Sequence, residues 1–194
     1  MILESIVTTV SKNGLVNIAP MGPVVAGGIE SPSFLLRPFN SSRTFANLIE
    51  TRRAVIHVTD DAYLFAVSAV SSFDESTVRK MVRPIHDRGW WVLKECHRWF
   101  AVEIESTSDT KPRVDMNCRI VDSATEQPFF GFNRAKHAVI EAAILATRTH
   151  ILPKEEVDAE LKRLRPLIEK TAGGREREGF ELLHQAIHER YTSR

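Results

Sequence analysis

The residues best suited to chemistry lie in a short segment that begins at Arg37. Arg37, Ser41, Ser42, Arg43 and Thr44 surround the predicted start of a helix. A helix start carries free backbone N–H groups and a partial positive charge, and hydroxyl and guanidinium groups bind the same anions. The segment therefore favours a phosphate-binding site. The alternative is that these hydroxyls only cap the helix, which is their commoner use.

A second segment, residues 17–22, leaves a predicted strand at Pro20. A proline removes a donor from the sheet, so we expect no regular ladder there, and nearby backbone groups need other partners if buried. The pyrimidine edge of a flavin ring, with N3–H, O2 and O4, offers matching donors and acceptors. The alternative is a plain turn.

The helix predicted from residue 133 carries a polar stripe. Arg134, His137, Glu141 and Arg148 recur at three-, four- and seven-residue steps, so they share one face. The stripe is interpreted either as the wall of a binding pocket or as ion pairs that join the C-terminal helices to the rest of the chain. The ion pairs are favoured.

Two other histidine and cysteine arrangements are weak signals. His184 and His188 have a spacing that suits a metal, but no third ligand is evident, and we predict a solvated helix face and no metal site. Cys96 and His97 are adjacent, so on a strand they point to opposite faces. We predict no thiol nucleophile. No glycine-rich phosphate loop is present, so a nicotinamide cofactor would bind only transiently.

Hydrophobic periodicity predicts a β-rich body to about residue 125, followed by three helices. The dipeptide Asn13-Gly14 predicts a tight hairpin between the first two strands. Trp90, Trp91 and Trp99 are expected in the core. Strands are expected at residues 2–10, 15–19, 33–37, 54–58, 90–105 and 113–121, and helices from Ser41 or Ser42, from Asp60 or Asp61, and at 133–149, 154–171 and 176–189.

Composition excludes several classes of protein. The 194 residues carry a net charge of +1, so the sequence lacks the strong positive charge that is typical of nucleic-acid-binding proteins. Two cysteines do not make a disulfide scaffold, and no apolar stretch approaches the roughly 20 residues that span a bilayer. The chain opens on a strand pattern rather than a secretory signal. We therefore expect a soluble, cytoplasmic protein that binds neither nucleic acid nor membrane.

The sequence resembles a known family along nearly its whole length. The opening hairpin from Ile6 through residues 17–22 is similar to that of the flavin-reductase-like FMN-binding split barrels. The same opening, Arg37-Pro38, residues 42–48 and above all the run 129–143 (FFGFNRAKHAVIEAA) resemble an uncharacterised archaeal and bacterial family known as domain of unknown function 447.

The resemblance implies a mainly β fold with α elements: a six-stranded FMN-binding split β-barrel at residues 1–127, with a C-terminal helical subdomain at residues 128–194 packed on the barrel or on a dimer partner. It implies FMN as the cofactor, held at the interface of a homodimer. Carried onto this sequence, the flavin ring would lie along Asn17, Ala19, Pro20, Met21 and Gly22. The ribityl phosphate would be held by Arg37, Ser41, Ser42, Arg43, Thr44 and Asn47, and a pocket wall would come from Asn133, Arg134 and His137.

Two functions follow as hypotheses. The first is an FMN-dependent oxidoreductase, with Arg37 or Arg134 placing positive charge near the flavin N1–C2=O edge; a link to tetrahydromethanopterin one-carbon metabolism extends it. The second is a flavin- or pterin-binding module without turnover. A third variant keeps the barrel but replaces the ligand with haem, a deazaflavin or pyridoxal phosphate.

Overall fold

The computed structural model describes residues 1–86 and 89–193, and the chain divides into two compact units. The first unit comprises residues 1–59 and 73–128, and the second comprises residues 60–72 and 129–194. Residues 60–72, which the sequence analysis placed with the barrel, therefore lie in the helical unit. The reason is that their helix buries Leu64, Phe65 and Ala66 and packs with helices from the end of the chain.

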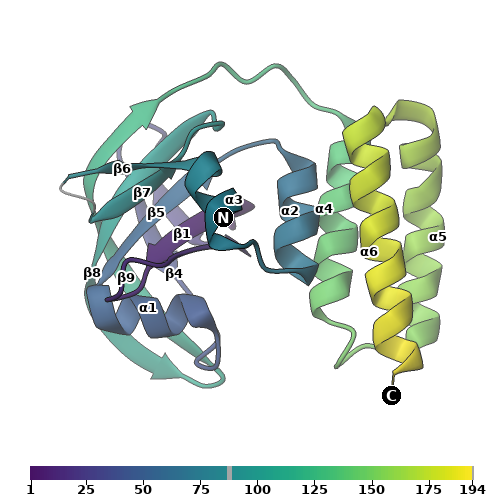
Figure 1. The fold of residues 1–194 in the computed structure, drawn as a ribbon, viewed down its shortest axis with the longest axis horizontal. Helices are drawn as coiled ribbons and strands as arrows, with labels where there is room; N and C mark the ends of the chain where they lie inside the picture. The colour runs from purple at the N-terminus through teal and green to yellow at the C-terminus, as the bar shows by residue number, and fades with distance from the viewer. Residues whose placement is uncertain (87–88, 194) are drawn as a thin grey trace. The chain divides into compact units, whose positions relative to one another are not determined.

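The first unit is built on a seven-stranded antiparallel sheet with the order β2-β1-β5-β8-β9-β4-β3 (Figure 1). A separate hairpin of β6 and β7 forms a second sheet, so the described residues contain nine strands rather than the six that the resemblance implied. The strands are β1 (Ser5–Val10), β2 (Val16–Met21), β3 (Val24–Gly27), β4 (Pro32–Leu36), β5 (Arg53–Val58), β6 (Val82–Ile85), β7 (Trp90–Leu93), β8 (Arg98–Thr110) and β9 (Arg113–Thr125).

The first residues of the chain join the two ends of the sheet. Ile2 forms an antiparallel bridge with Val24, the Leu3 amide donates to Pro23 O at 3.1 Å, and the Val25 amide donates to Met1 O at 2.7 Å. Residues next to β1 therefore pair with β3, the last strand of the order. These bonds connect the start of the chain to β3 and leave β2 as the terminal strand at the other end of the order.

The predicted hairpin between β1 and β2 is confirmed. The two strands pair antiparallel from Ser5 opposite Met21 to Val10 opposite Val16. Gly14 has a φ of +79°, a conformation that glycine adopts without strain. The expected break at Pro20 is wrong, because Pro20 pairs with Ile6 inside β2. The strand tolerates proline because β2 is the terminal strand of the sheet.

Two helices, α1 (Arg43–Thr51) and α3 (Glu75–Met81), belong to the first unit. The helix α1 was predicted, whereas α3, β3 and β6 were not. The helix α3 begins after Asp74, whose carboxylate accepts from the Thr77 amide at 3.0 Å. The core of this unit includes Trp90 and Trp99 as expected, and Trp91 is partly buried.

The second unit is a bundle of α2 (Ala62–Val70), α4 (Arg134–Thr147), α5 (Lys154–Thr171) and α6 (Gly174–Thr192) (Figure 1). Buried alanines of α4 allow close packing against α2 and α6. The helix α6 approaches α2 at Gly179, where an added Cβ would lie 3.3 Å from the Ala66 Cβ. No helix among the described residues is long and apolar enough to cross a membrane.

Candidate functional site

The two segments singled out in the sequence meet in the first unit. The Asn17 side-chain amide, on β2, donates a 3.1 Å hydrogen bond to the Thr44 hydroxyl in the first turn of α1. Thr44 is only 4% exposed. This bond joins the start of the terminal strand to the first turn of the helix, so the two predicted segments are in direct contact.

Asn47 provides a second buried link from α1 to the sheet. Its side-chain amide donates to the Thr9 hydroxyl on β1 at 3.0 Å, and both side chains are buried. The side chains of Thr44 and Asn47 thus make hydrogen bonds to residues inside the first unit. Their contribution is to hold the helix start in place.

The N-terminus of α1 is capped by Ser42. The Ser42 hydroxyl accepts from the Phe45 amide at 3.1 Å and donates to Phe39 O at 2.8 Å. Ser41 and Arg43 are exposed on either side of this cap. The backbone amides of Arg43 and Thr44 precede Ala46, whose amide donates the first hydrogen bond of the helix to Ser42 O, and among the described residues no acceptor for these two amides is found. The turn therefore offers two N–H donors and an arginine to an anion.

Arg37 is fixed before this turn. Its Nε donates to Asp115 Oδ1 at 2.8 Å, and the side chains of the pair are 43% and 22% exposed. The Arg37 carbonyl accepts from Arg113 at 2.8 Å, and the Arg113 guanidinium lies 4.1 Å from the centre of the Phe39 ring. Residues 37–39 are therefore anchored on β9, and Arg37 shares its charge with a carboxylate.

The remaining residues of the first predicted segment lie on β2 or directly after it. Ala19, Pro20, Met21 and Gly22 are all partly buried. Because β2 is the terminal strand, one of its edges faces away from β1. At Gly22 an added Cβ would lie 2.8 Å from the Ile2 side chain, so the glycine makes room for the start of the chain.

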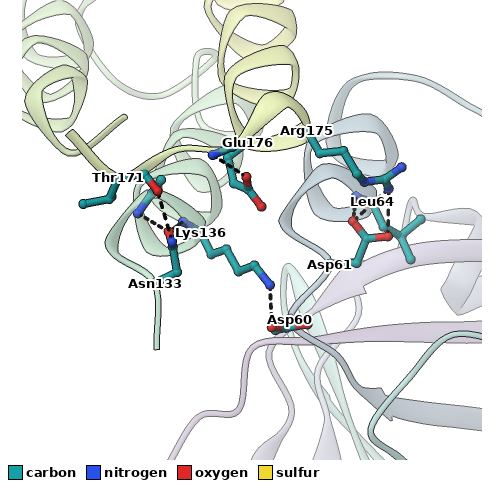
Figure 2. Close-up of polar contacts among 10 residues, drawn as sticks. Asp60, Asp61, Leu64, Asn133, Lys136, Thr171, Arg175 and Glu176 are labelled. Carbon is teal, nitrogen blue, oxygen red and sulfur yellow. Dashed lines mark hydrogen bonds and ion pairs between the residues drawn. The ribbon is translucent and has the colours of Figure 1, made fainter. Parts of the chain in front are cut away.

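The predicted pocket-wall residues belong to the helical unit. Asn133 caps α4: its Oδ1 accepts from the amides of Ala135 at 2.8 Å and Lys136 at 3.2 Å, and its Nδ2 donates to Thr171 O at 3.1 Å (Figure 2). Both polar atoms of Asn133 are engaged within the bundle.

Arg134 and His137 are exposed. The His137 ring stacks on Phe132, with 6.0 Å between the ring centres, and the edge of Phe132 contacts Phe129. Of the three pocket-wall residues, these two present side chains at the surface of their unit.

Sequence reasoning missed a polar cluster at the start of three helices. Lys136 pairs with Asp60 at 2.5 Å, and Arg175 contacts both carboxylate oxygens of Asp61 at 3.1 and 3.0 Å (Figure 2). Asp61 also caps α2 by accepting from the Leu64 amide at 3.1 Å. The sequence contained one sign of this cluster, the Asp60-Asp61 pair before the helix. The partners of these two residues lie 76 and 114 positions further along the chain.

His57 is the fully buried titratable side chain of the first unit. Its Nδ1 donates to Ile6 O at 3.0 Å, and its Nε2 accepts from the Leu93 amide at 3.0 Å, so the neutral ring joins β5 to β1 and β7. Burial lowers the pKa of His57 from 6.5 to about 4. A neutral ring with both nitrogens engaged has a structural role.

The two cysteines lack the properties of nucleophiles. Burial raises the pKa of Cys96 to about 11 and that of Cys118 to about 12. Neither thiol ionises at neutral pH, and the thiolate is the reactive form. Among residues 1–86 and 89–193, no group of three histidine, cysteine or acidic side chains is arranged to hold a metal ion.

Comparison with known proteins identifies both parts of the chain. The N-terminal domain of the protein family of unknown function DUF447 matches residues 3–127, and a second DUF447 domain matches residues 133–185. An FMN-bound protein of that family from Methanosarcina mazei has a similar structure, with a TM-score of 0.82 and 24% identity over 95% of this chain and 94% of that one.

Two further solved structures resemble part of the chain. A putative flavin reductase from Haemophilus somnus has a TM-score of 0.53 and 16% identity over 64% of this chain and 81% of its own. Flavoredoxin from Methanosarcina acetivorans has a TM-score of 0.54 and 12% identity over 67% and 72% of the two chains. These likenesses confirm the predicted fold class, a split β-barrel with C-terminal helices.

Proposed function

The chain belongs to the DUF447 family of proteins of unknown function, and we propose that it binds FMN and works as a flavin-dependent oxidoreductase. The family member from Methanosarcina mazei is FMN-bound, and a flavin reductase and a flavoredoxin share the fold of the first unit. The observation that carries the proposal is the Asn17–Thr44 hydrogen bond, because it joins a helix start that has available N–H donors to a terminal strand.

The phosphate of FMN fits the N-terminus of α1. Ser41, Ser42 and Arg43 supply hydroxyls and a guanidinium, and the amides of Arg43 and Thr44 supply N–H donors. Buried Thr44 and Asn47 take a positioning role, since their side chains bond to β2 and β1. Arg37, whose side chain is 43% exposed and pairs with Asp115, is the further residue that we assign to the phosphate.

The flavin ring fits residues 17–22. A planar heterocycle with alternating donors and acceptors needs backbone N–H and C=O groups, and a terminal strand has an edge without a sheet partner. Asn17 marks the end of this edge next to α1. We assign Asn17, Ala19, Pro20, Met21 and Gly22 to the ring on this basis.

When bound, FMN would supply the electron or hydride transfer, and the protein would supply orientation and charge. Arg37 and Arg134 are the candidates for stabilising negative charge on the reduced ring. Asn133, Arg134 and His137 form the proposed pocket wall, with Asn133 holding the start of α4 and the other two presenting exposed side chains.

We also propose a cytoplasmic homodimer, with a role near tetrahydromethanopterin-linked one-carbon metabolism. Phe130 is fully exposed and Phe132 is 88% exposed in the short irregular segment before α4. Exposed groups of large apolar side chains are typical of protein interfaces. The pterin link rests on the family resemblance alone.

The absorption spectrum of the purified protein tests the proposal. The expected result is the two-band spectrum of oxidised flavin, release of FMN on denaturation, and bleaching by NADH or NADPH. A protein that binds FMN but is reduced by neither donor would support the flavin-binding module instead. A colourless protein that takes up no added FMN would refute both.

A substitution localises the phosphate. Arg43→Ala should weaken binding of FMN by about tenfold, the effect of one lost charged contact, and leave binding of riboflavin unchanged. Lys12→Ala, at an exposed position in the β1–β2 turn, is the matched control. Equal losses of FMN and riboflavin affinity in Arg43→Ala would contradict a phosphate contact.

A further inference from the structure

A cavity of about 340 Å³ lies between α5 and α6, within the helical unit. The two helices run side by side in Figure 1. Positions on one face of α5 line it at steps of three and four residues, and two histidines one turn apart line it from α6. The lining residues are Lys154, Asp158, Leu161, Lys162, Arg165, His184 and His188.

The lining carries more basic than acidic side chains. Three side chains are permanently positive at neutral pH and one is a carboxylate. That carboxylate, Asp158, is paired with Lys154 one turn away. Arg165 is itself paired with Glu181, so the unpaired positive charge of the lining rests on Lys162.

Arg165 is held in a defined orientation. Its guanidinium pairs with Glu181 at 3.2 Å and lies 5.4 Å from the centre of the Phe180 ring. Phe180 is fully buried, so the ring offers a rigid surface to the guanidinium. A guanidinium fixed on a rigid surface loses less entropy when it binds an anion.

Three other lining side chains keep their donors available. In the part of the chain that the structure describes, no hydrogen bond or ion pair engages the side chain of Lys162, His184 or His188. Leu161, which is 5% exposed, gives the cavity an apolar floor. The cavity thus combines exposed N–H donors with one buried apolar side chain.

The ligand that fits is an anion rather than a metal cation. The two histidines and Asp158 have the residue types of a metal site, yet the described residues contain no arrangement that could hold a metal ion. Asp158 is already neutralised by Lys154. A cation would also be repelled by Lys162, whereas phosphate oxygens would gain from the charge of Lys162 and from the N–H donors of Arg165.

We propose that the α5–α6 cavity binds a small phosphate-bearing polyanion. Lys162 supplies the unpaired charge, and Arg165, His184 and His188 supply N–H donors to the phosphate oxygens. The site is built entirely from residues of the helical unit and shares none with the proposed FMN site. It is a second ligand site, in the domain to which the flavin proposal assigns only a pocket wall.

Calorimetric titration of the full-length protein, as purified, with sodium pyrophosphate at low ionic strength tests this site. We expect saturable binding that the double variant Lys162→Ala/His184→Ala weakens by at least about tenfold, the effect of one lost charged contact. Both residues are exposed, so the variant should keep its fold. Lys170→Ala, an exposed lysine of α5 outside the cavity, should bind like the wild type.

NMR of the histidine ring protons gives an independent readout. Pyrophosphate should shift the signals of His184 and His188 and leave the signal of buried His57 in place. Absence of binding, or equal affinity in the double variant and the wild type, would overturn the proposal. A loss of affinity in Lys170→Ala equal to that in the double variant would also overturn it, because it would show only nonspecific attraction to a basic helix.

Discussion

The Asn17 amide donates a 3.1 Å hydrogen bond to the hydroxyl of Thr44, and this contact joins β2 to the first turn of α1. The two residues are 27 positions apart in the chain. Because Thr44 is buried and bonded from the sheet, the exposed residues around it present their donors from a fixed position. The contact makes one surface of a strand end and a helix start.

Breaking this contact should affect both stability and FMN binding. Thr44→Val keeps the side-chain volume but leaves the Asn17 amide without its acceptor, which we expect to cost about 1–2 kcal/mol in the free energy of unfolding. FMN affinity should fall several-fold, since the helix start loses its link to the strand. Urea denaturation and fluorescence titration measure the two effects.

Thr51→Val is the matched control, because the Thr51 hydroxyl donates to Asn47 O at the other end of the same helix. It should leave FMN affinity unchanged. A Thr44→Val protein with wild-type affinity would show that the helix start is positioned by other contacts.

Buried His57 should make the stability of the protein depend on pH. Its folded-state pKa of about 4 lies below the unfolded value of 6.5, so the unfolded chain binds a proton that the folded chain does not. The contribution is present above pH 6.5 and is lost as the pH falls from 6.5 toward 4, by an amount of order 3 kcal/mol. Urea denaturation at a series of pH values measures this loss.

His57→Gln should flatten that pH dependence and lower stability at pH 7, because one of two buried hydrogen bonds is lost. His150→Gln, at an exposed position, is the matched substitution. An unchanged slope between pH 6.5 and 4 in His57→Gln would assign the acid sensitivity to other groups.

Asp61 should stabilise the helical unit mainly through its cap. Asp61→Ala removes the acceptor for the Leu64 amide and the partner of Arg175, and we expect a loss of about 1–2 kcal/mol. Asp61→Asn keeps a capping oxygen and should lose less than half as much. Thermal denaturation followed by circular dichroism measures the difference.

Arg175→Ala separates the cap from the ion pair. The Arg175 side chain is 63% exposed, so its pair with Asp61 should contribute no more than about 0.5 kcal/mol. If Arg175→Ala were as destabilising as Asp61→Ala, the ion pair rather than the cap would be the main interaction.

Arg37 should raise the reduction potential of bound FMN. Removal of its charge in Arg37→Ala disfavours the reduced anion, and we expect a potential lower by about 20–30 mV, since 30 mV corresponds to about 1.4 kcal/mol for a two-electron couple. Arg37→Lys keeps the charge and should stay closer to the wild type. Spectroelectrochemical titration measures the shift, and Arg134→Ala is tested in parallel. A wild-type potential in both alanine variants would remove the proposed role.

The exposed phenylalanines should support the homodimer. Phe130→Ser/Phe132→Ser removes two large apolar side chains, and we expect light scattering to report monomers where the wild type reports dimers. Ile151→Ser changes another exposed apolar residue outside this segment and should remain dimeric. A wild-type protein that is monomeric with FMN bound would contradict the dimer itself.

The sequence by itself determined the elements whose signals are local. Asn13-Gly14 predicted the first hairpin, the apolar stripe of residues 154–171 predicted α5, and the residues around Ser42 predicted a capped helix start. The family resemblance added the fold class and the DUF447 family, which the match of residues 3–127 and 133–185 confirmed. The hairpin, the helix and the helix cap depend on neighbours within a few residues. The family resemblance depends on motifs that can be read directly from the sequence.

Only the tertiary structure decided how distant residues combine. Pro20 was predicted to break the strand, but β2 continues through it. Because β2 is the terminal strand of the sheet, a residue without a backbone N–H does not have to break a hydrogen bond to a second neighbouring strand. Residues 60–72 looked like part of the barrel, but their buried apolar faces pack in the helical unit. The roles of Thr44 and Asn47 likewise depended on partners 27 and 38 residues away. Sheet order, burial and long-range hydrogen bonds arise from the packing of the whole chain, and no local pattern encodes them.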